Sequence, residues 1–174
     1  MQFFDVIERR QSIRAYQAAA VEKHKLERIL AAAQNAPSAG GLQSYTIVIV
    51  EKPETKARLA EVALGQDFLA KAPVVLAFFA DRLHSEQKYG TRGATLYCVQ
   101  DATIAAAYVQ LTAAAEGLGC CWVGAFDEGR VSEVLGAPAH LRPVALLPIG
   151  YAAEAPATHA RRPLSELVLH EGWR

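Results

Sequence analysis

Three arginines and a serine lie within six residues near the start of the chain, in the stretch RRQSIRAY at residues 9–16. Arg10, Ser12 and Arg14 alternate, so an extended backbone would place all three side chains on one face. Guanidinium groups form forked hydrogen bonds with phosphate and carboxylate oxygens. The spacing favours a site for a small anion, although unrelated, solvent-exposed arginines would explain this first group equally well.

A second basic group lies almost at the other end of the chain and consists of His159, Arg161 and Arg162. If the two ends of the folded chain meet, both groups would converge on one anion, such as a phosphate. The whole chain has 18 basic and 18 acidic residues, so its formal net charge is zero. Proteins that bind nucleic acids or membrane surfaces usually carry a strong excess of positive charge, so we expect neither as a partner.

Nothing in the sequence predicts an exported or membrane-anchored chain. The first ten residues mix acidic and basic side chains instead of forming an apolar run. The longest apolar stretch, residues 101–118, is interrupted by polar side chains. Cys98, Cys120 and Cys121 form neither a CxxC motif nor an even set for disulfides. We therefore expect a cytoplasmic protein with buried, unreactive thiols in the apolar run CCWVGAF.

Apolar runs and helical periodicity alternate along the chain, which predicts an α+β fold in one domain, residues 1–174. The apolar runs lack polar alternation, so we expect strands covered on both faces. The expected strands are residues 45–51, 73–80, 120–126 and 143–149. The expected helices are residues 3–10, 22–36, 54–64, 101–118 and 127–136.

The expected helix at 101–118 and the end of the chain both predict buried contacts. The helix is rich in alanine, so neighbouring elements can approach it closely. The last residues carry large apolar side chains, namely Leu164, Leu167, Val168, Leu169 and Trp173. Docking on a second copy of the chain would bury such a tail, and we therefore expect a homodimer.

Six motifs follow one another in a fixed order along the chain. They are RRQSIRAY, APSAGGLQ, APVVLAFFAD, QDATIAAAYVQLTAAAEGLGCCWVGAF, LLPIGY and RRPLSELV. Their order and spacing resemble those of the FMN-dependent nitroreductase family over essentially the whole chain. The resemblance implies a three-layer α-β-α sandwich, in which helices wrap a central mixed or antiparallel sheet. It also implies an intertwined homodimer with two FMN sites at the subunit interface.

The first motif resembles the family's cofactor-binding motif, which here includes Arg10, Gln11, Ser12 and Arg14. The resemblance implies that Arg10 and Ser12 hold the phosphate or ribityl end of FMN. It places Arg14 near the N1/O2 edge of the flavin ring. A fixed cation at that edge stabilises the reduced flavin, which carries negative charge there.

Two later segments resemble further parts of the family's cofactor site. Arg161 matches the C-terminal phosphate-binding arginine, and Arg162 would compensate for His159, which stands where the family often has lysine. Gly124 and Ala125 match the segment whose main-chain N–H groups approach flavin N5. Small residues allow that close approach, although a plain strand-end glycine is the simpler interpretation of Gly124 by itself.

The loop PSAGGLQS resembles the family loop that contributes to the flavin bound mainly by the other subunit. The residues carried over are Pro37, Ser38, Ala39 and Gln43. Gly41 differs, because many members have asparagine there. The variant SAGGLQ is similar to the branch that contains thiazoline- and oxazoline-oxidising dehydrogenases.

Four other residues have two interpretations each. Gln66 is either a contact to the flavin edge or an exposed loop residue. Tyr89, Arg92 and Tyr97 would either border the substrate pocket or belong to a solvated helix.

The resemblance implies ping-pong chemistry, in which NADH or NADPH reduces FMN and a nitroaromatic, a quinone or a related small acceptor then takes the electrons. No GxGxxG motif follows a strand, and the histidines lack metal-ligand spacing. One alternative is a flavin-dependent dehydrogenase or other non-reductase chemistry on the same scaffold. Another is a non-catalytic module that binds an anion or a nucleotide.

Overall fold

The structure is a computed structural model that describes residues 2–157 and 160–173. Its helices are α1 (Phe3–Arg9), α2 (Lys23–Gln34), α3 (Pro53–Val62), α4 (Phe68–Lys71), α5 (Arg82–Arg92), α6 (Cys98–Ala115), α7 (Glu128–Leu135) and α8 (Leu164–Leu167). A 3-10 turn, η1 (Ala39–Gly41), and a π-helical stretch, η2 (Gly93–Tyr97), join them. The strands are β1 (Tyr45–Val50), β2 (Val74–Asp81), β3 (Gly119–Cys120) and β4 (Leu141–Gly150).

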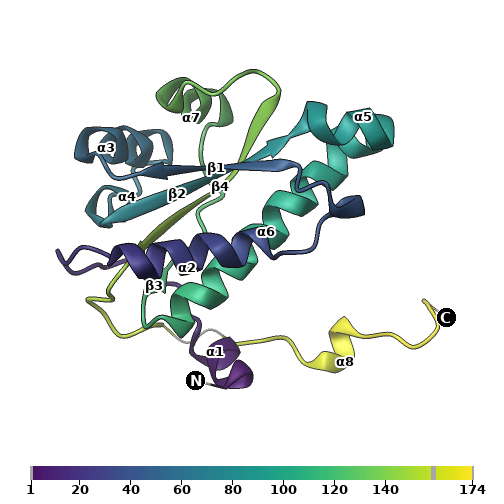
Figure 1. The fold of residues 1–174 in the computed structure, drawn as a ribbon. Helices are drawn as coiled ribbons and strands as arrows, with labels where there is room; N and C mark the ends of the chain where they lie inside the picture. The colour runs from purple at the N-terminus through teal and green to yellow at the C-terminus, as the bar shows by residue number, and fades with distance from the viewer. Residues whose placement is uncertain (1, 158–159, 174) are drawn as a thin grey trace.

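The four strands form one antiparallel sheet in the order β1-β2-β4-β3. Leu76 of β2 is aligned with Ile49 on one side and with Leu147 of β4 on the other. Helices cover both faces of this sheet, with α2 and α6 on one side and α3 and α7 on the other (Figure 1). The three-layer α+β architecture is therefore confirmed.

Alternate residues of β2 enter two separate hydrophobic cores. Val74, Leu76 and Phe78 pack with α2 and α6, whereas Val75 and Phe79 pack with the opposite helical layer. Every residue of β2 from Val74 to Ala80 is buried, which explains why this run shows no polar alternation.

The alanine-rich helix is the centre of the first core. Ala105, Ala106, Val109 and Ala113 of α6 are fully buried, and they pack against Ile29 and Ala33 of α2. The helix begins three residues earlier than expected, at Cys98, because η2 runs directly into it. It ends at Ala115, three residues before the expected end at Leu118, and Gly117 follows with a positive φ of 76°.

Two sequence-based expectations about strands are wrong. Residues 120–126 form a strand only at Cys120, plus one isolated bridge between Val123 and Leu146. Beyond that bridge, the chain turns away from the sheet toward α7 and no longer pairs with β4. The strand β1 is not covered on both faces, because it lies at the sheet edge and leaves Ile49 exposed.

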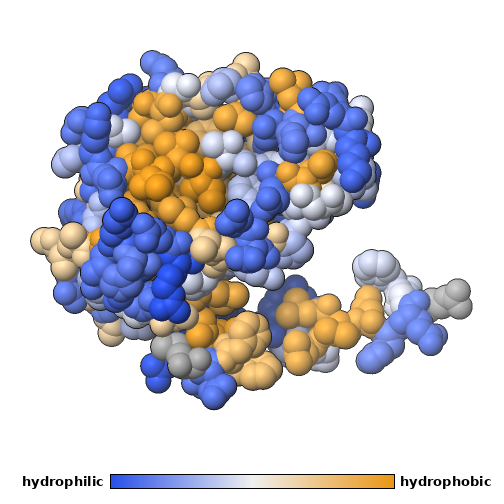
Figure 2. Space-filling model, in the orientation of Figure 1, coloured by the Kyte–Doolittle hydropathy of each residue, from blue (hydrophilic) through white to orange (hydrophobic). Residues whose placement is uncertain are grey.

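The C-terminal tail leaves the body of the molecule beside α1 and carries α8 away from it (Figure 1). Leu164 and Trp173 have relative exposures of 76% and 94%. Apolar atoms gather on this tail, on α1 and at the sheet edge where β1 lies (Figure 2). Among residues 2–157 and 160–173, no helix is long and apolar enough to cross a membrane.

Candidate functional site

The RRQSIRAY segment is extended after α1 ends, as its alternating pattern predicts. Arg10 has extended backbone angles, and Ser12 forms a parallel bridge with Cys120 of β3. The N–H of Ile13 donates to the Cys120 carbonyl at 3.0 Å, and the Ile13 side chain is buried. Because side chains alternate along extended chain, the burial of Ile13 turns Ser12 and Arg14 toward the opposite face.

The thiols next to this segment are buried and free. Burial raises the pKa of the Cys120 thiol to about 12, and it also raises the pKa of Cys121. The Arg14 guanidinium and the Ser12 hydroxyl partly offset the rise in the pKa of Cys121. Both thiols are therefore neutral at physiological pH, and the nearby arginine charges remain available for another anion.

The chain after β4 returns to the N-terminal segment, so the two ends of the fold meet. The N–H of Gln17 donates to the Tyr151 carbonyl, and the N–H of Ala153 donates to the Ala15 carbonyl, both at 2.9 Å. The Glu154 carboxylate accepts a hydrogen bond from the Ala15 N–H at 3.1 Å, and another from the Arg14 N–H.

A cavity of about 180 Å³ lies where these segments meet. Arg9, Arg10 and Gln11 line one side of it. The other lining residues are Ile13, Ala114, Gly117, Leu118, Gly119, Ala152 and Pro156. Two guanidinium-bearing residues beside small, apolar surroundings provide a site that suits an anionic group.

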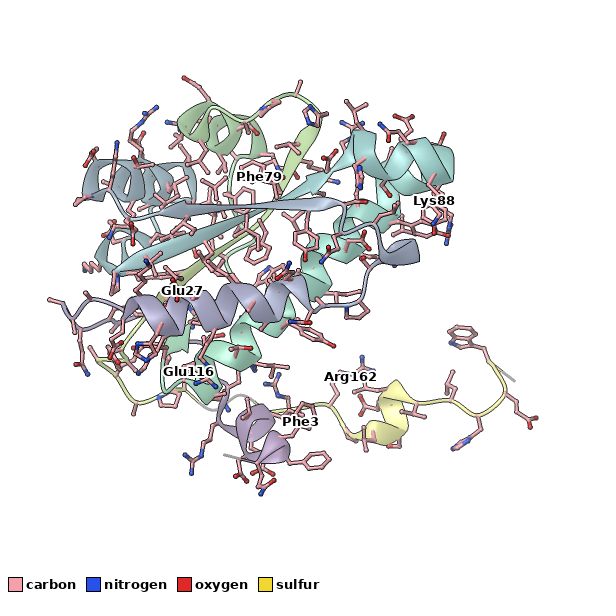
Figure 3. The ribbon with its side chains drawn as sticks, in the orientation of Figure 1. Phe3, Glu27, Phe79, Lys88, Glu116 and Arg162 are labelled. Atoms are coloured by element: carbon pink, nitrogen blue, oxygen red, sulfur yellow. The ribbon has the colours of Figure 1, made fainter. Side chains whose placement is uncertain are left out.

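The second basic group continues from this cavity along the exposed tail. The chain reaches the cavity at Pro156, and Arg161 and Arg162 follow on the segment that leads into α8 (Figure 3). Arg162 donates through Nε to the Glu166 carboxylate at 3.0 Å, so this guanidinium is already paired. His159 lies outside the described residues.

The predicted cofactor loop is held mainly by hydrogen bonds. Ser38 Oγ accepts from the Gln43 N–H at 2.9 Å, and the Gln43 amide donates to the Gln34 carbonyl at 2.7 Å. The carboxylate of Asp101, in the first turn of α6, accepts from the Ala39 N–H at 2.8 Å. Pro37 is exposed at the start of this loop.

Asp101 is the residue that the sequence-based analysis missed. Its relative exposure is 1%, and it also accepts a hydrogen bond from the Ser44 N–H at 3.2 Å. A signal for it was present, because Asp101 is the single charged residue between Cys98 and Ala115. A carboxylate in an otherwise uncharged, buried helix needs hydrogen-bond donors from another segment.

The Gly124–Ala125 segment is exposed and follows the isolated bridge at Val123. The Gln66 amide donates to the Ala125 carbonyl at 3.0 Å and to the Ala63 carbonyl at 2.8 Å. Gln66, in the loop after α3, thus fixes the main chain of this segment through the carbonyl of Ala125.

The α5–η2 region borders the loop of residues 37–44. Lys88 and Tyr89 lie against Gly40, and His84 Nε2 is 3.1 Å from the Leu42 carbonyl (Figure 3). Arg92 donates to the Tyr97 hydroxyl at 3.0 Å, and the Tyr89 and Tyr97 rings meet edge to face. These residues belong to helical segments, and their role beside a substrate stays a prediction.

The N-terminal arginine group and the 37–44 loop lie at opposite ends of α6, and the Gly124–Ala125 segment lies apart from both, beside Gln66. Ala39 is bound to Asp101 in the first turn, whereas the cavity beside Arg10 includes Ala114 in the last turn. Asp101 and Ala114 are thirteen positions apart on α6, which corresponds to about 20 Å along the helix axis. One chain therefore does not bring the Arg10 group and the loop to a single small site.

Known proteins resemble this chain in both sequence and structure. Residues 7–66 and 62–151 match the model of the Nitroreductase family. A Thermus thermophilus protein named NADH dehydrogenase is 36% identical, over 95% of this chain and 93% of its own length. A Bacillus subtilis protein named FMN reductase (NAD(P)H) is 34% identical, over 92% of this chain and 69% of its own length. An FMN-dependent nitroreductase from Clostridium difficile superposes with a TM-score of 0.80 and 29% identity, covering 98% and 99% of the two chains.

Proposed function

This chain belongs to the nitroreductase family, and from that premise we propose that it binds FMN and passes electrons from NADH or NADPH to a small acceptor. The relatives named for FMN and NAD(P)H support this proposal. The observation that carries it is the cavity beside Arg10, where the two ends of the fold meet.

The residues at this cavity fit the phosphate end of FMN. Arg9 and Arg10 provide positive charge, and Gln11 adds an amide donor. The family resemblance adds Ser12 and Arg161 to this end of the site, but Arg161 lies on the tail and does not line the cavity. The tail would have to bring Arg161 back toward Arg10, and docking on a second subunit would hold it there.

The exposed backbone at Gly124 and Ala125 fits the ring end of the cofactor, because neither residue has a side chain larger than a methyl group. The Arg14 side chain is exposed on the same face of its segment as Ser12, and it would hold the pyrimidine edge of the ring. When bound, the flavin supplies hydride and electron transfer, which no side chain of the protein can perform.

We propose that the functional unit is a homodimer with two shared FMN sites. The exposed apolar side chains of α1 and of the tail need a partner surface. The 37–44 loop and the cavity beside Arg10 of the same chain are separated by about 20 Å along α6, which supports the same proposal. In a dimer, the loop with Pro37, Ser38, Ala39 and Gln43 would reach the FMN bound beside Arg10 of the partner subunit.

Absorption spectroscopy of the purified protein tests this function. A bound flavin spectrum, before or after incubation with FMN, is the expected result. The flavin should then be bleached by NADH or NADPH and reoxidised by a nitroaromatic or a quinone. A protein that stays colourless with FMN would contradict the proposal. Flavin that NAD(P)H does not reduce would instead indicate dehydrogenase or other chemistry.

The Arg10→Ala substitution tests the phosphate site. Loss of a charge-assisted hydrogen bond should weaken FMN binding by about 1.5–3 kcal/mol. Flavin fluorescence titration measures this change. Arg58→Ala is the control, because Arg58 is an exposed arginine on α3, away from the cavity. Equal FMN affinity in the Arg10→Ala variant and the wild type would remove Arg10 from the site.

A further inference from the structure

We infer that Asp101 is a positioning residue for the cofactor site: its buried carboxylate fixes the loop of residues 37–44 that would contact the FMN of the other subunit. The inference rests on the proposed function and deepens it, because it assigns a role to a residue that lies outside the cofactor-binding motifs.

Asp101 holds the loop at two points. Oδ1 accepts from the Ala39 N–H at 2.8 Å, where the 3-10 turn begins, and Oδ2 accepts from the Ser44 N–H at 3.2 Å, just before β1. The carboxylate is 1% exposed, so its charge depends on these donors in place of water.

The other contacts that fix the loop are hydrogen bonds: Ser38 Oγ accepts from the Gln43 N–H, and the Asp81 N–H of β2 donates to the Ser44 carbonyl at 2.9 Å. No residue of the turn Ala39–Gly41 is buried, so apolar packing does not hold it. Gln43 has a positive φ of 52°, a conformation that a residue other than glycine rarely adopts. The other side chains that hydrogen-bond within or to the loop are more exposed than Asp101, which makes Asp101 the buried anchor.

The position of Asp101 predicts that its effect crosses the subunit boundary. Asp101 is about 20 Å along α6 from Ala114, which lines the cavity beside Arg10 of the same chain. A change at Asp101 should therefore leave that chain's own phosphate site intact. The site that loses its loop is the one beside Arg10 of the partner subunit.

Asp101→Asn tests the anchor with a minimal change in shape. An amide offers one acceptor, so its NH₂ group must face the N–H of either Ala39 or Ser44. We expect the Kd for FMN to rise at least tenfold in flavin fluorescence titrations. Asp127→Asn is the matched control, because Asp127 also accepts a backbone N–H, that of Arg130 at 2.9 Å. Its Kd should stay within twofold of the wild-type value.

A mixed dimer separates this positioning role from a general loss of stability. Co-expression of differently tagged Arg10→Ala and Asp101→Asn chains, followed by two affinity steps, yields the heterodimer. One of its sites carries both defects and the other carries neither. We expect one FMN per dimer bound with wild-type affinity, whereas both mutant homodimers bind weakly. A heterodimer without a wild-type site would show that Asp101 acts within its own subunit and would overturn the inference.

Ala39→Pro tests the same contact if Asp101→Asn fails to fold. It deletes the N–H that Oδ1 accepts, and proline suits the first residue of a helical turn after the extended Ser38. Like Asp101→Asn, the Ala39→Pro substitution should raise the Kd for FMN at least tenfold. If the wild type binds FMN and the folded variants bind it equally well, the inference alone is wrong. A wild type that binds no FMN overturns the proposed function as well.

Discussion

Gly41 shows how one residue's backbone angle decides which substitutions the cofactor loop accepts. Its φ is +71°, in the left-handed region, and an added Cβ would meet no atom within 4 Å. Asparagine tolerates this conformation better than alanine does. We predict that Gly41→Ala lowers the free energy of unfolding by about 1–2 kcal/mol and that Gly41→Asn lowers it by less. Urea denaturation of both variants measures the difference.

The neighbouring Gly40 provides the control for this prediction. Its φ is +57°, but a Cβ there would collide with the Tyr89 hydroxyl. Gly40→Asn should therefore destabilise the protein more than Gly41→Asn, because strain and collision act together. Equal losses at both positions would show that backbone angle alone limits this loop.

At the scale of elements, the contact between α2 and α6 depends on small side chains. Ala33 of α2 is fully buried in the core that contains Ala105, Ala106 and Ala113 of α6. We predict that Ala33→Leu lowers the free energy of unfolding by about 1–3 kcal/mol, because the added volume must push the helices apart. Denaturant midpoints, with unchanged slopes, measure this loss.

Ala31→Leu on the same helix is the matched control. Ala31 is exposed, so the same added volume meets solvent. Its effect should stay within about 0.5 kcal/mol. A comparable loss at both positions would point to helix propensity instead of packing.

At the scale of the whole molecule, the tail predicts the oligomeric state. Leu164 and Leu167 are exposed on α8, and burying such a side chain contributes about 1.5–3 kcal/mol. We predict that the protein has twice the 18.8 kDa chain mass in light scattering, and that the double change Leu164→Lys and Leu167→Lys shifts it toward the monomer. The same variant should lose FMN, because each proposed site needs both chains.

Leu83→Lys is the control for that experiment. Leu83 is also an exposed leucine, but it lies on α5, which is separated from the tail and drawn above it in Figure 1. It should leave the dimer mass unchanged. Dissociation by both variants would mean that the tail has no special role in assembly.

The sequence by itself determined the features that depend on local order. Periodicity located α2, α6 and α7 to within a few residues, and the continuous apolar runs identified β2 and β4. Alternation in RRQSIRAY predicted extended chain, and the order of the motifs indicated the family. These signals are carried by spacing along the chain, so they can be recognised before any distant contact is known.

Tertiary structure decided the features that depend on contacts between residues far apart in the sequence. It limited strand pairing in the 120–126 run to Cys120 and an isolated bridge at Val123, because Gly124 and Ala125 leave the sheet. It left β1 exposed at an edge, and it placed the cavity beside Arg10 and the 37–44 loop at opposite ends of α6. The role of Asp101 belongs here too, since a carboxylate acquires its function from donors more than 50 residues away, and only folding brings them together.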